Sequence, residues 1–121
     1  MKRVAAILAA LAFAAVLGTG AAADVPENVK SIVKKNCVGC HKGRTPPKGL
    51  NLEPANLAAV IDAPSSEVPG AKIIDSGAPE ASYLLKKVRR QKDIAGKPMP
   101  PGKALTAEEL RALEDWIAGL K

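Results

Sequence analysis

Aromatic residues are scarce in this sequence. The 121 residues include one Phe, one Tyr and one Trp, and Phe13 lies in a segment that we expect to be removed. Aromatic side chains bury more area per residue than most others. Two of them give a chain of this length only a modest core, so we expect something other than side chains to fill part of the interior.

Histidine, cysteine and methionine are scarce as well. The chain has one His, two Cys and two Met, one of which is the initiator. Two Cys and one His supply three ligands, one fewer than the usual structural zinc site needs. Beyond residue 23 there is no apolar run long enough to span a bilayer, no alternating pattern of strand length and no internal repeat. The length allows one domain and excludes a large multidomain enzyme.

The first 23 residues resemble a secretory signal peptide. Lys2 and Arg3 form a positive start, residues 4–17 are almost wholly apolar, and residues 21–23 are three alanines. We expect cleavage after Ala23, which leaves a mature domain of residues 24–121 in the periplasm with no membrane span. The alternative is an uncleaved membrane anchor, since residues 4–23 are nearly long enough to cross a bilayer.

The mature chain is basic. Without Lys2 and Arg3 it has 16 basic and 12 acidic residues, a formal charge of +4. The basic residues gather in two runs, residues 30–48 and 86–103. A basic surface can bind nucleic acid, an anionic membrane or an acidic protein. An exported protein seldom meets nucleic acid, so we expect no nucleic-acid partner.

Helical spacing of apolar residues predicts four helical segments and an all-α domain with long loops. The first covers residues 25–36, with Asp24 and Glu27 as a possible capping box. The second begins at Pro54 and ends before residue 64, and the third runs over residues 79–88. The third should expose its basic side chains to solvent, namely Lys86, Lys87, Arg89 and Arg90.

The last helical segment has the clearest start signal. Thr106 and Glu109 are spaced as a capping box, and Leu105 can pack onto Leu110 across the helix start. The apolar positions that follow recur at helical spacing and include Trp116.

Residues 37–41 read Cys-Val-Gly-Cys-His. This is the attachment sequence of c-type haem, in which Cys37 and Cys40 bond the two vinyl groups and His41 ligates the iron. Three alternatives are weaker. A thioredoxin-like redox pair needs a βαβ context, zinc lacks a fourth ligand, and a disulfide across two residues would close a very small loop.

On these residues the chain resembles the small monohaem cytochromes c with an N-terminal haem motif. Further matches are residues 97–101, which read Lys-Pro-Met-Pro-Pro, and the ending from Leu105 to Ile117. The segment from residue 79 with this loop also resembles planctomycete-type cytochrome c modules. The resemblance implies an all-α fold of about four helices and long loops around one covalent haem c with its iron. It also implies that the N- and C-terminal helices cross beside the haem. The N-terminal helix lacks the aromatic residue common at that crossing, so Trp116 would have to supply the bulk.

The second iron ligand follows by elimination. His41 is the only His, and Met99 is the only Met of the mature chain. Pro98, Pro100 and Pro101 stiffen the loop around Met99, whereas a core-filling Met would be badly placed there. We therefore expect His41 and Met99 as the axial pair. The carbonyl of Pro47 or Leu50 should hold the second ring nitrogen of His41, and Asn51 is a candidate to fix the same loop.

The expected haem lining is a set of twelve apolar residues: Val33, Leu50, Leu52, Leu57, Ile73, Ile74, Leu84, Leu85, Val88, Leu105, Leu113 and Trp116. Tyr83 could direct its hydroxyl to a haem propionate or only to water. Arg44 and Lys48 could pair with propionates or remain solvated.

With both axial positions filled and no second His to act as a base, a one-electron carrier is expected rather than an enzyme. The two basic runs would form a positive collar around the haem edge and dock redox proteins through an acidic patch. Two other interpretations of the function stay open. The chain could be a haem subunit of a periplasmic dehydrogenase complex, or a haem enzyme or gas sensor if Met99 is not a stable ligand.

Overall fold

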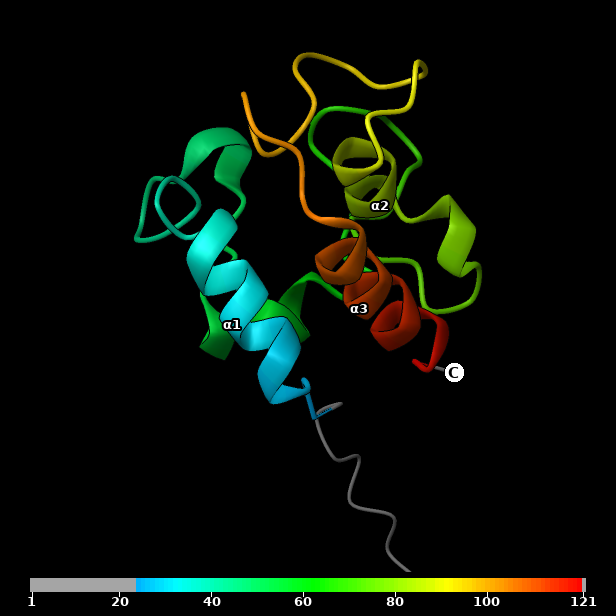
Figure 1. Ribbon diagram of the computed structural model, residues 1–121. Helices are drawn as coiled ribbons and strands as arrows, with labels where there is room; N and C mark the ends of the chain where they lie inside the picture. Colours follow the sequence, from blue (N-terminus) through cyan, green and yellow to red (C-terminus); the bar gives the residue numbers. More distant parts are fainter. Residues whose placement is uncertain (1–23, 121) are drawn as a thin grey trace, which may run out of the picture.

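Three α-helices and three short 3₁₀ helices make up the regular structure of the domain. The computed structural model describes residues 24–120. Figure 1 shows the helices α1 (Glu27–Asn36), α2 (Tyr83–Val88) and α3 (Ala107–Ala118). The 3₁₀ helices are η1 (Pro47–Gly49), η2 (Pro54–Val60) and η3 (Pro79–Ala81). Within the described residues no β-strand forms, and two isolated bridges, Ile61 to Ile74 and Pro64 to Lys72, join loops. The expectation of an all-α domain with long loops is confirmed.

The expected signal peptide, residues 1–23, lies outside the described residues. In the part of the chain that the structure does describe, no helix combines the length and the apolarity needed to cross a bilayer.

Helix α1 begins two residues later than the sequence suggested, and its expected capping box is absent. Pro26 occupies the N-cap position without a side-chain hydrogen bond. Glu27 is the first helical residue and forms an exposed ion pair with Lys30, with Nζ and Oε1 3.1 Å apart. Asp24 therefore does not cap the helix, because the N-cap position falls two residues later, at Pro26, whose side chain has no hydrogen-bond acceptor.

The third expected helix is divided at Ser82. This residue is fully buried, and its hydroxyl accepts a 2.8 Å hydrogen bond from the amide of Asp75. The amides of Tyr83 and Leu84 donate to the carbonyls of Lys72 and Ile73, each over 2.9 Å. These amides would otherwise need carbonyls of a preceding helical turn. The long-range bonds explain why η3 and α2 are separate elements.

Helix α3 starts as the sequence predicts. The Thr106 hydroxyl accepts a hydrogen bond from the amide of Glu109, and the Glu109 carboxylate accepts one from the amide of Thr106. This reciprocal capping box satisfies two amides that have no partner inside the helix.

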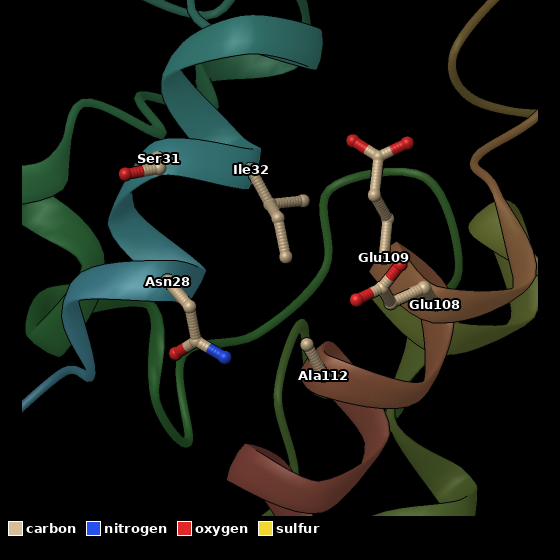
Figure 2. Close-up of a pocket in the computed structure, with 6 residues that line it drawn as sticks. All are labelled: Asn28, Ser31, Ile32, Glu108, Glu109 and Ala112. Atoms are coloured by element: carbon tan, nitrogen blue, oxygen red, sulfur yellow. The ribbon is translucent and has the colours of Figure 1, made fainter.

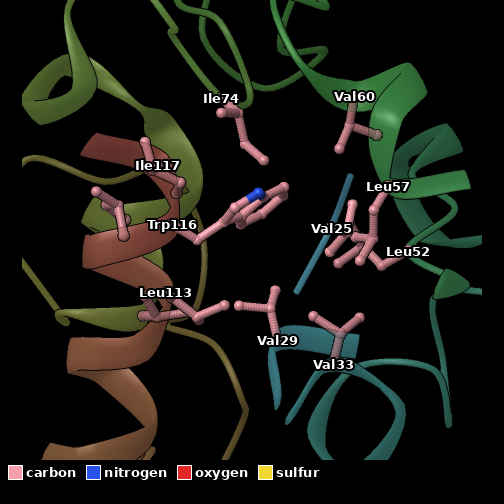
Figure 3. Packing of buried hydrophobic residues seen from close by; sticks show 12 residues of the cluster. Val25, Val29, Val33, Leu52, Leu57, Val60, Ile74, Leu113, Trp116 and Ile117 are labelled. Atoms are coloured by element: carbon pink, nitrogen blue, oxygen red, sulfur yellow. The ribbon is translucent and has the colours of Figure 1, made fainter. Parts of the chain in front are cut away.

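The core joins α1 to α3. In Figure 3 Val29 of α1 and Leu113 of α3 point toward one another, and Trp116 lies in the same cluster near Ile74. Val29 and Ile117 are 0% exposed, and Trp116 is 8% exposed. Trp116 is the aromatic residue of this cluster, as expected from the lack of an aromatic in α1.

Candidate functional site

One large cavity brings together all four candidate residues. Its volume is about 850 Å³, and Cys37, Cys40, His41 and Met99 all line it. The first three come from the turn that follows α1, and Met99 comes from the loop between α2 and α3. In Figure 1 these two segments are far apart along the colour scale yet border the same region of the molecule. The sequence motif and the proline-rich loop therefore meet at one site.

The end of α1 shapes the Cys37–His41 segment into a tight turn. The amide of Cys37 donates to the carbonyl of Val33 over 2.8 Å, which continues the helical pattern. The amides of Cys40 and His41 then both donate back to the carbonyl of Cys37, over 3.3 and 3.0 Å. The two thiols and the imidazole are consequently held within a single turn, as attachment to one porphyrin edge requires.

Cys37 and Cys40 do not form a disulfide with each other, and their surroundings differ. Cys37 is half-buried, whereas Cys40 is exposed. Burial, with a smaller contribution from the negative charge of Glu109, raises the pKa of the Cys37 thiol to about 11. The Cys37 side chain is therefore neutral at physiological pH.

The orientation of His41 is set by the loop that follows it. Its Nδ1 lies 3.0 Å from the carbonyl oxygen of Leu50. A carbonyl can only accept, so Nδ1 carries the proton and Nε2 keeps its lone pair for a metal. Of the two carbonyls considered from the sequence, Leu50 rather than Pro47 is the partner. The carbonyl of His41 also accepts from the amide of Leu52 over 2.9 Å.

Asn51 holds this loop through its side chain. Its amide nitrogen donates to the carbonyl of Gly43 over 3.3 Å and to the carboxylate of Glu53 over 2.9 Å. Its side-chain oxygen accepts from the amide of Glu53 over 2.9 Å. The loop that presents the Leu50 carbonyl is thus fixed through Asn51, at Gly43 and at Glu53.

The Met99 loop is bound to the last turn of α2. The amide of Met99 donates to the carbonyl of Lys87 over 3.1 Å. The guanidinium of Arg90 donates to the carbonyls of Pro100 and Gly102, over 2.7 and 3.4 Å. Arg90, which we expected to face solvent, is only partly exposed, and it ties the Met99 loop to the end of α2.

Two further basic residues, one in α2 and one at its C-terminal end, are paired with carboxylates. Lys86 lies 2.9 Å from Asp93, and Arg89 bridges Glu80 at 2.7 Å and Glu114 at 3.2 Å. These pairs remove much of the free positive charge expected from this helix.

Lys87 departs furthest from the sequence expectation. It is 6% exposed and pairs with Glu67, with Nζ and Oε2 3.1 Å apart. Tyr83, also buried, donates its hydroxyl hydrogen to Glu67 over 2.9 Å rather than facing water. All three side chains line the cavity. Sequence reasoning missed Glu67, because an isolated acidic residue in a loop has no periodic signal.

The cavity fits a haem by size and by lining. A volume of about 850 Å³ lies within the range of pockets that bury cofactors. Of the twelve apolar residues expected to line it, all do except Ile74, Leu85 and Leu105, which pack into the core or against it. Within residues 24–120, the indole Nε1 of Trp116 is buried without a hydrogen-bond partner, and Trp116 also borders the cavity. A ligand that combines apolar surface with polar groups suits this lining.

A second, smaller hollow lies between α1 and α3 (Figure 2). Its volume is about 390 Å³, and Ile32 points from α1 toward Ala112 on α3. The remaining lining residues are Asn28, Ser31, Glu108 and Glu109. None of the candidate residues contacts it, so it is not the haem site. Among the residues that the structure describes, no group of three or more His, Cys, Asp or Glu side chains is placed to hold a metal ion.

Comparison with known proteins identifies a family. The family model described as Cytochrome c matches residues 26–121, which is nearly the whole domain. No curated protein and no solved structure matches the chain.

Proposed function

This chain belongs to the cytochrome c family, and from that premise we propose that it is a periplasmic one-electron carrier with His41 and Met99 as iron ligands. The family has covalently bound haem c with its iron, so the chain is a haem c electron-transfer protein with redox partners. Bound haem supplies the Fe(III)/Fe(II) couple, which exchanges one electron at a time. Attachment through Cys37 and Cys40 is part of the proposal, as is cleavage after Ala23.

One observation supports the ligand assignment most strongly. All four candidate residues line the same cavity. Three of them, Cys37, Cys40 and His41, lie close together in the sequence, whereas Met99 comes 58 residues after His41. Met99 is the only thioether that the mature chain can offer, and His41 the only imidazole. Met with His is a standard pair of haem ligands.

His41 is prepared for this task by its hydrogen bond. Because Nδ1 donates to the Leu50 carbonyl, the ring cannot rotate without losing that bond. In the neutral ring this bond also places the proton on Nδ1 and leaves the lone pair on Nε2, the nitrogen that would bind the iron. His41 is thus oriented before the metal arrives.

The Met99 loop would keep a weak ligand in place. Three prolines flank Met99 and restrict the backbone, while Lys87 and Arg90 bind the loop through hydrogen bonds. A loop fixed in this way offers the sulfur with little loss of entropy. With both axial positions occupied, the iron would have no open position for a substrate, which supports a carrier rather than an enzyme.

We further propose that redox partners dock at the mouth of the cavity, and that each partner contacts it with an acidic patch of its own surface. Lys48 and Lys97 line the cavity and are exposed. Lys86, Lys87 and Arg89 are engaged with carboxylates of this chain. Fewer unpaired cations therefore remain than the sequence suggested, and Lys48 and Lys97 are two exposed ones that border the cavity.

Met99→Ala tests the ligand assignment. The variant should lose the weak far-red absorption that a thioether gives to oxidised haem c, and its reduction potential should fall. The reduced variant should bind carbon monoxide readily, whereas the wild-type protein should resist it. The measurement is a spectral titration of both proteins with carbon monoxide. Equal oxidised spectra and equal affinities would show that Met99 is not the ligand, and would favour the enzyme or sensor reading.

Two simple measurements test the remaining parts. N-terminal sequencing of the protein recovered from the periplasm should begin at Asp24. Size-exclusion chromatography of a native periplasmic extract should give the monomer of a free carrier. Elution in a large assembly would favour a subunit of a dehydrogenase complex instead.

A further inference from the structure

Three polar side chains are buried together in the wall of the cavity, at the end nearest the Met99 loop. Lys87 and Tyr83 are each 6% exposed, and the Glu67 side chain is 14% exposed. Burying two charged groups is costly unless they are paired and hydrogen-bonded.

The three side chains satisfy one another. Glu67 Oε2 accepts from the Tyr83 hydroxyl over 2.9 Å and lies 3.1 Å from Lys87 Nζ. Burial opposes the ionised form of Glu67, but the hydrogen bonds and charge of these partners prevail and lower the pKa of its carboxyl. The Lys87 ammonium also lies 5.7 Å from the centre of the Tyr83 ring. The cluster therefore consists of the ion pair between Glu67 and Lys87, with the Tyr83 hydroxyl hydrogen-bonded to Glu67.

The side chains of Tyr83 and Lys87 hold the Ala95 end of the segment from Ala95 to Met99, and the main chain of Lys87 holds the Met99 end. The amide of Ala95 donates to the Tyr83 hydroxyl over 3.0 Å, and its carbonyl accepts from Lys87 Nζ over 2.7 Å. The main-chain carbonyl of Lys87 accepts from the amide of Met99 over 3.1 Å. Ala95 is small and exposed, so its position comes from these hydrogen bonds and not from burial.

We propose that Glu67, Lys87 and Tyr83 form a clamp that positions the Met99 loop and thereby controls how readily Met99 leaves the iron. The proposal rests on His/Met ligation as stated above. Glu67 acts through the other two, because it orients Tyr83 and neutralises Lys87. These are positioning residues, and their effect should appear in the exchange of the iron ligand.

Imidazole binding to the oxidised holoprotein measures this exchange. Imidazole must displace Met99, so its apparent affinity is the intrinsic affinity multiplied by the fraction of protein with the loop open. Tyr83→Phe removes the hydrogen bonds to Ala95 and Glu67 without changing a charge. We expect it to bind imidazole about tenfold more tightly, the effect of losing one or two hydrogen bonds. The far-red thioether band should weaken in parallel.

A double variant, Glu67→Gln with Lys87→Met, tests the ion pair. Removing both charges leaves the net charge unchanged, so an electrostatic effect on the iron does not mask a change in the loop. The double variant should also bind imidazole about tenfold more tightly. Glu80→Gln with Arg89→Met is the matched control, since it removes a different ion pair at the end of α2 and likewise leaves the net charge unchanged. The control should bind imidazole as the wild type does.

The outcomes separate this clamp from the ligand assignment. If Tyr83→Phe lowers unfolding stability but leaves imidazole affinity and the thioether band unchanged, the cluster only stabilises the fold and the clamp is refuted. In a Met99→Ala background, Tyr83→Phe should have no further effect on imidazole affinity; a persistent tenfold effect would also refute the clamp. If Met99→Ala alone alters neither spectrum nor affinity, it is the ligand assignment that fails.

Discussion

Glu109 links the helix that precedes the haem motif to the C-terminal helix, and its removal should destabilise the domain. Its carboxylate accepts from the amide of Thr106 over 3.1 Å and from the side-chain amide of Asn36 over 2.8 Å. Lys35 lies 3.6 Å away but is 72% exposed, whereas the Glu109 side chain is 15% exposed. The perturbation is Glu109→Ala.

The magnitude follows from these contacts. Loss of half of the capping box costs about 1 kcal/mol. Loss of a hydrogen bond between a neutral amide and a shielded carboxylate costs about 1.5 to 3 kcal/mol. The exposed pair with Lys35 contributes close to nothing. Glu109→Ala should therefore lower the free energy of unfolding by about 2 to 4 kcal/mol, and Thr106→Ala by only about 1 kcal/mol.

The assay is guanidinium unfolding of the oxidised holoprotein, followed by far-ultraviolet circular dichroism. Glu108→Ala is the control, because it removes a neighbouring carboxylate from the same first turn of α3. A shared effect of helix-dipole charge is thereby subtracted. If Glu109→Ala lowers the free energy of unfolding by no more than Glu108→Ala does, the link between the helices is not stabilising and the prediction is wrong.

The same link predicts a pH dependence. The hydrogen bonds from Thr106 and Asn36 lower the pKa of Glu109 below its ordinary 4.5 in the folded protein. A lowered folded pKa means that the stabilisation is complete above the unfolded value and is lost as the pH falls through the folded value. The difference in stability between wild type and Glu109→Ala should therefore be constant near pH 7 and shrink below about pH 4.

Three further changes have definite expected outcomes. Cys37→Ala or Cys40→Ala should leave one thioether bond and a poorly accumulating holoprotein, measured by pyridine haemochrome spectra; a yield equal to wild type would contradict the attachment assignment. Leu57→Ala, at a cavity-lining residue that is 1% exposed, should lower the unfolding free energy of the holoprotein by about 2 to 5 kcal/mol, and a loss below about 1 kcal/mol would mean that the site collapses around the deletion. Lys48→Glu with Lys97→Glu should slow reduction by an acidic redox protein and flatten the salt dependence of the rate in stopped-flow experiments. An unchanged rate at all ionic strengths would contradict the proposed docking surface.

The features that the sequence predicts well depend on residues close together in the chain. The turn that holds Cys37 to His41 spans five positions, and the capping box of Thr106 and Glu109 spans four. The helical spacing of apolar positions in the last segment also predicts its buried face, since Leu113, Trp116 and Ile117 are all buried. Each of these follows from the local geometry of a helix or a helix end, which a short stretch of sequence determines.

Other features required the tertiary structure, since they join residues that have no local relation. Helix α2 begins after Ser82 because loop carbonyls at residues 72 and 73 capture its first amides. Lys87 has the spacing of a solvent-facing residue, yet it is buried because Glu67 reaches it from a loop twenty residues earlier. The choice of Leu50 over Pro47 at His41 depends on the path of a loop. Sequence periodicity cannot report such pairings, because the free energy of a buried charge is set by whichever partner the fold brings to it.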